Sequence, residues 1–289
     1  MSQYALEARN LTKAYPGFTL GPLTLALPSG CIMGLVGENG AGKTTTIKLL
    51  LQMLRRDSGS VALLGEDCSS QTASVGIKEQ IGVVLDEVGF PECLTAKQVN
   101  NILKHTYTAW EENTYFSYLK KLSLPLDKSF GEYSRGMKMK LGIASALSHR
   151  AKLLILDEAT SGLDPVMRDE ILEILQEFLQ DENRAVLMST HITSDLDKIA
   201  DHIVLLHQGR VMFQKTKEEL DLNYGVLHCG RELFESLAPE DVAAYIRDEY
   251  QYRVLVKNRG ELESHIRDLT MDRASIEDIM LFIARGEHQ

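Results

Sequence analysis

The 289-residue sequence predicts an α/β domain that begins with an antiparallel β region, contains an all-helical insert and ends in a small α+β appendage. Two observations predict the α/β core. Continuous apolar runs at residues 31–36 and 153–156 are typical of strands that are buried on both faces. A helical pattern follows each run, and alternating strands and helices are typical of an α/β fold. At about 150 residues per domain, the length fits one large domain or two of unequal size.

The antiparallel region is expected within residues 1–65. Residues 4–8 and 18–27 alternate apolar and polar side chains, as half-buried strands do, and a turn at residues 15–18 joins them. The apolar strand at residues 31–36 then leads directly into a glycine-rich loop, and a helical pattern follows that loop.

Residues 91–150 are expected to form the helical insert. Thr95 and Gln98 fit a capping box, and apolar residues follow at helical spacing as far as Trp110. We therefore assign Trp110 to the core of the insert, and Phe90, which lies beside a turn, to contact with a partner protein. Two further helices are expected, one over residues 115–122 and one after Tyr133.

The α/β alternation returns from residue 151, and residues 222–289 form a separate accessory domain. The core elements expected here are a strand at 153–156, a helix from Pro165 through 179, a strand at 185–188, a short helix, a strand at 203–206 and a hairpin through 208–210. The accessory domain is expected to hold a strand at 252–256, a helix at 261–269 and a final helix that Ser275 caps.

Charge and cysteine spacing exclude several classes of protein. Lysine and arginine number 31 against 41 aspartates and glutamates, so the net charge is −10, which excludes a generally basic nucleic-acid binder. The 4 cysteines lack metal-ligand spacing and are expected to be free thiols. No apolar run approaches the ~18 residues that span a bilayer. We therefore expect a soluble chain, or one that docks on a separate membrane protein.

The loop after the first buried strand has the pattern of a phosphate-binding loop. It reads Gly37-x-x-x-x-Gly42-Lys43-Thr44 between a strand and a helix. In such a loop the backbone N–H groups surround phosphates, the lysine neutralises the β and γ oxygens, and the hydroxyl ligates Mg²⁺. The sequence therefore predicts a nucleotide site here.

Two acids, Asp157 and Glu158, follow the buried run at residues 153–156. Ligands bind α/β sheets at the carboxyl ends of their strands, so these acids are expected at the edge of the nucleotide site. Asp157 is placed to hold Mg²⁺, and Glu158 to accept a proton from an attacking water.

Three further motifs, in a fixed order with the first two, resemble the ATP-binding subunit of ABC transporters over residues 3–221. They are Tyr133-Ser-Arg-Gly-Met137, similar to the signature motif; Ser161-Gly-Leu-Asp164, similar to the D-loop; and His191, similar to the switch histidine. The resemblance implies catalytic roles for Glu158, His191, Ser134 and Gly136. It also implies ATP contacts from Tyr15, which would stack on adenine, and from Gly37, Glu38, Asn39, Gly40, Ala41, Gly42, Lys43, Thr44, Thr45 and Asp164. The Mg²⁺ ligands would be Thr44, Asp86 and Asp157.

The sequence departs from the family pattern at two places. The signature motif has Arg135 where the family has its first glycine, with Tyr133 and Met137 also changed. Asp86 stands where the family has the Q-loop glutamine, and its carboxylate is an oxygen ligand suited to Mg²⁺.

The resemblance also implies how the chain works. It predicts an ATP-binding domain over residues 1–221 and an accessory domain over 222–289. ATP would lie between Lys43 of one subunit and Ser134 of another in a head-to-tail dimer, homomeric or with a related ATPase. The dimer would drive a separate transmembrane permease from the cytoplasmic face of the membrane. The variant motifs and the appendage are similar to the bacterial branch that exports antimicrobial or toxin-like peptides, phenol-soluble modulin exporters in particular.

Two rival interpretations start from the same loop. The first is a non-transport ABC ATPase with a regulatory role, or one that acts in translation or DNA repair. The latter usually carries two cassettes or a long coiled coil, which this sequence lacks. The second is a GTPase or a small-molecule kinase. The sequence has no NKxD-type guanine motif, and a kinase leaves Ser134 and His191 unexplained.

Overall fold

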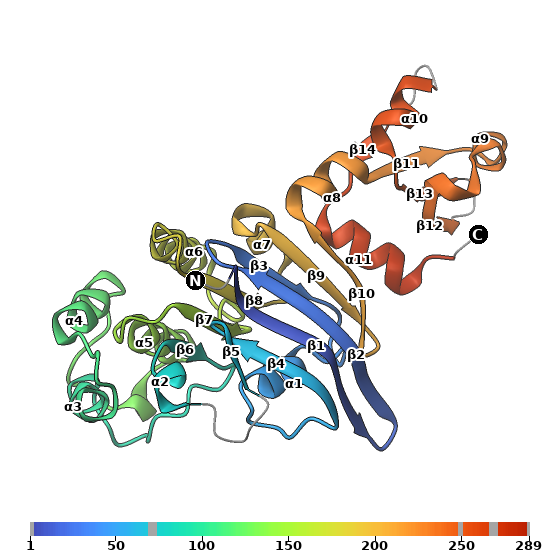
Figure 1. The fold of residues 1–289 in the computed structure, drawn as a ribbon. Coiled ribbons are helices and arrows are strands. Elements are labelled where there is room, and N and C mark those ends of the chain that lie inside the picture. The colour runs from blue at the N-terminus through green and yellow to red at the C-terminus, as the bar shows by residue number, and fades with distance from the viewer. Residues whose placement is uncertain (1–2, 69–73, 248–250, 266–270, 288–289) are drawn as a thin grey trace.

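The computed structural model describes residues 3–68, 74–247, 251–265 and 271–287 (Figure 1). Its centre is a six-stranded sheet in the order β10-β9-β3-β8-β7-β6. Five strands are parallel: β3 (Ile32–Val36), β6 (Ile81–Val84), β7 (Leu153–Asp157), β8 (Ala185–Ser189) and β9 (His202–His207). β10 (Arg210–Thr216) closes one edge as an antiparallel hairpin with β9. Every residue of β3, β7 and β8 is buried, which confirms the prediction from the continuous apolar runs.

A second sheet, in the order β2-β1-β4-β5, is the predicted antiparallel region. Its strands are β1 (Tyr4–Tyr15), β2 (Phe18–Pro28), β4 (Ser58–Leu63) and β5 (Glu66–Asp67). β1 is longer than expected, because a register shift near Asn10, which has φ 50°, interrupts the alternation without ending the strand. Helix α1 (Lys43–Leu50) contributes Ile47, Leu49 and Leu50 to one apolar core with residues of both sheets.

The helical insert consists of α3 (Ala96–Thr106), α4 (Glu112–Lys121) and α5 (Arg135–Leu147), with α2 (Val75–Lys78) before it and the short η1 (Phe130–Glu132) within it. The predicted capping box is present, since the Thr95 hydroxyl accepts from the Gln98 N–H and the Gln98 side chain accepts from the Thr95 N–H.

The helical stripe that was predicted to reach Trp110 ends sooner. Tyr107 has extended backbone angles and leaves the helix, and its ring stacks on His149 with the centroids 4.1 Å apart. Trp110 nevertheless packs against the core, and its indole N–H donates to the Asn100 side chain at 2.9 Å. Its assignment to the core is therefore correct, although a helical position is not the reason.

Helices α6 (Pro165–Phe178) and α7 (Thr193–Ile199) complete the α/β core at the predicted places. The part of the chain that the structure describes has no helix both long and apolar enough to cross a membrane. All 4 cysteines are free, as predicted.

The accessory region is a four-stranded antiparallel sheet in the order β12-β13-β11-β14. Its elements are α8 (Lys217–Asn223), β11 (Gly225–Cys229), α9 (Arg231–Ser236), η2 (Pro239–Asp241), β12 (Val242–Arg247), β13 (Tyr252–Val256), α10 (Arg259–His265), β14 (Met271–Arg273) and α11 (Ile276–Arg285). The strand predicted at 252–256 and the Ser275 cap are confirmed. The helix predicted at 261–269 begins two residues earlier, and its residues 266–269 lie outside the described parts.

Helix α11 joins the accessory sheet to the α/β core. It packs against β12 and β13 on one side and against α7 and β9 on the other (Figure 1). Ile276, Ile279 and Phe282 are each at most 3% exposed and belong to the same apolar cluster as residues of β9. The apolar face of the last helix is thus buried within its own chain.

Candidate nucleotide site

The glycine loop lies between β3 and α1, where two glycines have positions that no other residue fits. A Cβ on Gly37 would lie 2.3 Å from the Leu206 carbonyl oxygen. Gly42 has φ +107°, and a Cβ there would lie 2.7 Å from Leu20 Cδ1. Because Gly42 is also the N-cap residue of α1, no side chain caps that helix, which leaves the N–H groups of its first turn for a ligand.

Lys43 is held at the inner wall of the loop. Its ammonium group donates to the carbonyl oxygens of Gly37 at 2.7 Å and Glu38 at 3.3 Å, and the residue is only 6% exposed. The same ammonium lies 3.7 Å from Glu158 Oε1. The loop therefore presents a fixed positive charge to a phosphate, and Glu158 is its counterion.

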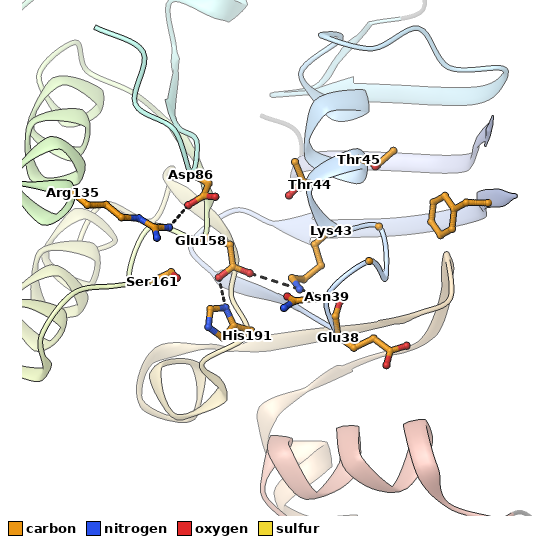
Figure 2. A pocket seen from close by; sticks show the side chains of 13 residues that line it. Glu38, Asn39, Lys43, Thr44, Thr45, Asp86, Arg135, Glu158, Ser161 and His191 are labelled. Carbon is orange, nitrogen blue, oxygen red and sulfur yellow. Dashed lines mark hydrogen bonds and ion pairs between the residues drawn. The ribbon is translucent and has the colours of Figure 1, made fainter. Parts of the chain in front are cut away.

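The two acids after β7 have different surroundings. Asp157 is 1% exposed, and Ser189 Oγ, from the adjacent position of β8, donates to Asp157 Oδ1 at 2.5 Å. Glu158 has φ +53°, in the left-handed region that side chains rarely adopt, and its N–H donates to the Ser189 carbonyl at 3.1 Å. This turn directs the Glu158 side chain toward Lys43 and toward His191, whose Nδ1 lies 2.7 Å from Glu158 Oε2 (Figure 2).

Lys43, Glu158 and His191 line one cavity of about 440 Å³, which is within the size range of small-molecule sites. Figure 2 shows Lys43 and Thr44 on one side of it, facing Asp86, Glu158 and His191. The lining residues are Phe18, Glu38, Asn39, Gly40, Gly42, Lys43, Thr44, Thr45, Asp86, Arg135, Glu158, Ser161 and His191.

The oxygen donors suit a magnesium ion that arrives with the nucleotide. Mg²⁺ usually keeps several waters and binds through one or two carboxylates plus substrate phosphates. The described residues contain no cluster of three or more His, Cys, Asp or Glu side chains that could hold a metal without such help. Thr44 and Asp86 line the cavity, whereas Asp157 does not line it and is buried in a hydrogen bond with Ser189. Asp86 is also paired, since Arg135 Nη2 donates to its Oδ1 at 2.6 Å.

Known proteins are similar to this chain in sequence and in fold. The model of the ABC transporter family matches residues 20–161. The bacitracin transport ATP-binding protein BcrA of Enterococcus faecalis is 34% identical over 221 residues, which is 75% of this chain and 71% of that protein. The lantibiotic transport ATP-binding protein SrtF of Streptococcus pyogenes is 34% identical over 213 residues, 73% of this chain and 90% of that protein. The chain belongs to the ABC transporter ATP-binding family.

Solved structures confirm the ABC ATPase fold. An ATP-binding subunit of an ABC transporter superimposes with a TM-score of 0.68 at 27% identity, and covers 75% of this chain and 91% of its own. A dimeric bacterial ABC transporter cassette, at 20% identity, has a TM-score of 0.66, and the match covers 73% of this chain and 98% of that one. At this identity the match supports the fold alone. This chain is thus an ABC ATPase, which binds ATP and hydrolyses it to power transport.

Besides Gly37 and Ala41 of the loop and the buried Asp157, four predicted site residues of the ABC ATPase do not line its own cavity. Ser134 is exposed and caps α5, with its Oγ accepting from the Met137 N–H at 3.2 Å, and Gly136 follows it in the first turn. Asp164 is exposed and caps α6 in the same way. Tyr15 lies at the end of β1, 39% exposed.

Other residues line or support the cavity without having been predicted as site residues. Phe18 is the aromatic residue of the first hairpin that lines the cavity, and it opens β2 directly after the turn. Ser161 also lines the cavity. Ser189 supports Asp157, and its signal in the sequence is a hydroxyl at the carboxyl end of an otherwise apolar strand.

Proposed function

We propose that this ABC ATPase powers the export of antimicrobial or toxin-like peptides through a separate transmembrane permease at the cytoplasmic face of the membrane. The support for the peptide class is that relatives at 34% identity are named for bacitracin and lantibiotic transport. Small drugs are the second candidate class, because the daunorubicin/doxorubicin resistance protein DrrA of Streptomyces peucetius is 32% identical over 232 residues.

The observation that carries the proposed chemistry is the position of Glu158 between Lys43 and His191. One carboxylate oxygen of Glu158 lies 3.7 Å from Lys43 Nζ, and the other lies 2.7 Å from His191 Nδ1. A carboxylate in this place can accept the proton of the attacking water. His191 holds Glu158 in place and contacts the transferring phosphoryl group. Thr44, Asp86 and Asp157 would hold a Mg²⁺ ion that arrives with the nucleotide, and the ion would neutralise part of the phosphate charge.

Three residues outside the cavity support a site shared between two subunits. Ser134 and Asp164 are exposed and Gly136 is half-buried, so they can meet a nucleotide bound to a second ATPase subunit. In a head-to-tail dimer, Ser134 and the N-terminus of α5 would contact the γ-phosphate held by the partner's glycine loop. Tyr15 remains our proposal for adenine stacking, with Phe18 beside it at the cavity wall.

An apolar groove is the proposed docking surface for the permease. Two adjoining cavities share Val83, Leu85 and Tyr107 and extend from α1 to α5. Met53, at one end, is 56% exposed. Phe90, at the other end, is half-buried against Phe130 and lines the groove, as its assignment to a partner contact requires.

Susceptibility assays test the substrate class. A strain that lacks the chain should become sensitive to one class of compound, with bacitracin, a lantibiotic and daunorubicin compared in parallel. The wild-type chain should restore resistance, and Lys43→Ala should not. Restored resistance to daunorubicin alone would favour drug export, and unchanged susceptibility to all three would contradict the proposal.

A further inference from the structure

The two departures from the family pattern, Asp86 and Arg135, meet each other in the structure. The Arg135 guanidinium donates to the Asp86 carboxylate at 2.6 Å, and both side chains line the nucleotide cavity (Figure 2). Asp86 follows β6 of the central sheet, whereas Arg135 is the first residue of α5 in the helical insert. The pair therefore joins two parts of the molecule at the site where phosphates are expected.

We propose that Arg135 is a positioning residue for Asp86: it holds and neutralises the carboxylate beside the nucleotide phosphates. The proposal rests on the proposed nucleotide site. Without Arg135, Asp86 would add an uncompensated negative charge to a cavity that must accept a triphosphate. The other cavity acids have partners of their own, because Glu158 contacts Lys43 and Glu38 lies 3.1 Å from His207 Nδ1.

The surroundings of Arg135 fix its position. Its stem lies along the backbone of Gly162, since a Cβ built on that glycine would be 3.7 Å from Arg135 Cδ, Cζ and Nε. Ser134 caps the helix that Arg135 begins. The two side chains of the pair are 59% and 49% exposed, and ion pairs of that exposure contribute little to folding. Removal of the pair should therefore change ligand binding and leave the fold intact.

A double-mutant cycle tests this role. Wild type, Arg135→Gln, Asp86→Asn and the double variant are titrated with ATP in excess EDTA, which removes the cation that would otherwise neutralise Asp86. We expect Arg135→Gln to weaken ATP binding by about tenfold, and the double variant to bind within about twofold of wild type. Arg135→Lys, which keeps the charge, should stay close to wild type. Lys138→Gln removes a charge from the same helix outside the cavity and should have no effect.

Two results would overturn the proposal. One is an equal loss of affinity from Arg135→Gln in the Asp86→Asn background, because Arg135 would then contact phosphate itself. The other is unchanged affinity in both backgrounds. If the cavity did not bind ATP at all, the result would differ, because folded wild type and folded Lys43→Ala would give the same ATP titration.

Discussion

Glu158 is the residue on which the proposed chemistry depends most. Its side chain is 15% exposed and contacts both Lys43 and His191, while its left-handed backbone is stabilised by two contacts from its N–H to Ser189. Glutamine has the same shape and keeps hydrogen-bonding capacity, but it cannot accept a proton from water. Glu158→Gln should therefore lower the ATP hydrolysis rate by about 10²-fold or more, and leave ATP affinity within about threefold of wild type.

Lys43→Ala is the matched variant for that measurement. It removes the positive charge of the phosphate cradle, so ATP affinity itself should fall. The two variants are compared by steady-state phosphate release and by equilibrium ATP binding. Turnover by Glu158→Gln at close to the wild-type rate would show that another group accepts the proton.

We expect the free energy of unfolding to depend on pH through a second residue, His149. Its ring is buried beneath Tyr107, and burial lowers its pKa, although its Nδ1 contact with the Glu79 carbonyl at 2.9 Å acts in the opposite direction. The unfolded chain then binds a proton more readily than the folded chain. The free energy of unfolding is thus unaffected by His149 above its ordinary pKa of about 6.5, and falls as the pH drops below it.

Chemical denaturation at pH 7.5 and 5.5 measures this effect. Between the two pH values, the free energy of unfolding of wild type should fall by more than that of His149→Gln. Only the difference between pH values is compared, because the substitution also changes packing. Equal losses in the two proteins would mean that other groups are responsible for the pH dependence.

At the scale of elements, α11 decides whether the accessory region is an independent unit. Its apolar face is buried between the accessory sheet and α7, which begins two residues after His191. Ile279→Ala should lower the free energy of unfolding by about 2–5 kcal/mol, because it leaves a cavity in this joint core. Ile102→Ala on α3 is the control, since Ile102 is 49% exposed, and its effect should stay within about 0.5 kcal/mol.

The same experiment reports on cooperativity. A single unfolding transition that Ile279→Ala shifts as a whole is expected from the shared core. Two separate transitions, with Ile279→Ala shifting only the one of smaller amplitude, would show that residues 222–289 unfold independently. That result would fit their prediction as a separate domain.

At the scale of the whole molecule, the described chain contains a cavity with the glycine loop, but Ser134 and Gly136 do not line it. We therefore expect two defective chains to complement each other. Lys43→Ala removes the cradle, and Ser134→Asp places a negative charge against the partner's nucleotide while it retains a good helix cap. Each variant alone should be inactive. Their mixture should regain part of the activity, since one of the two sites in a mixed dimer is intact.

Ser134→Asn serves as the control, because asparagine also caps a helix but carries no charge. It should keep more ATPase activity than Ser134→Asp. ATPase assays on mixed, differently tagged chains measure the recovery. Inactive mixtures in which heterodimers are shown to form would place the whole site within one chain.

Local sequence patterns determined many of the structural elements and several site residues of this protein. The glycine loop, the buried runs of β3 and β7, the capping boxes at Thr95 and Ser275 and the acids after β7 are each encoded by neighbouring residues. Strands β4, β6, β11 and β12 were not predicted from periodicity, because four to six residues contain too few repeats. β3, β7 and β8 are equally short, and they were predicted from their continuous apolar runs instead.

Tertiary structure alone decided which distant side chains meet. Asp86 and Arg135 are separated by 49 positions, and the packing of α5 against β6 brings them together, so a predicted metal ligand also has an arginine partner. Phe18 lines the cavity, whereas the family resemblance implied Tyr15. The apolar face of α11 is plain from periodicity, but its partners, α7 and β9, follow from packing. A short pattern specifies a cap or a buried strand, whereas contacts between elements depend on how all of them bury their apolar surface together.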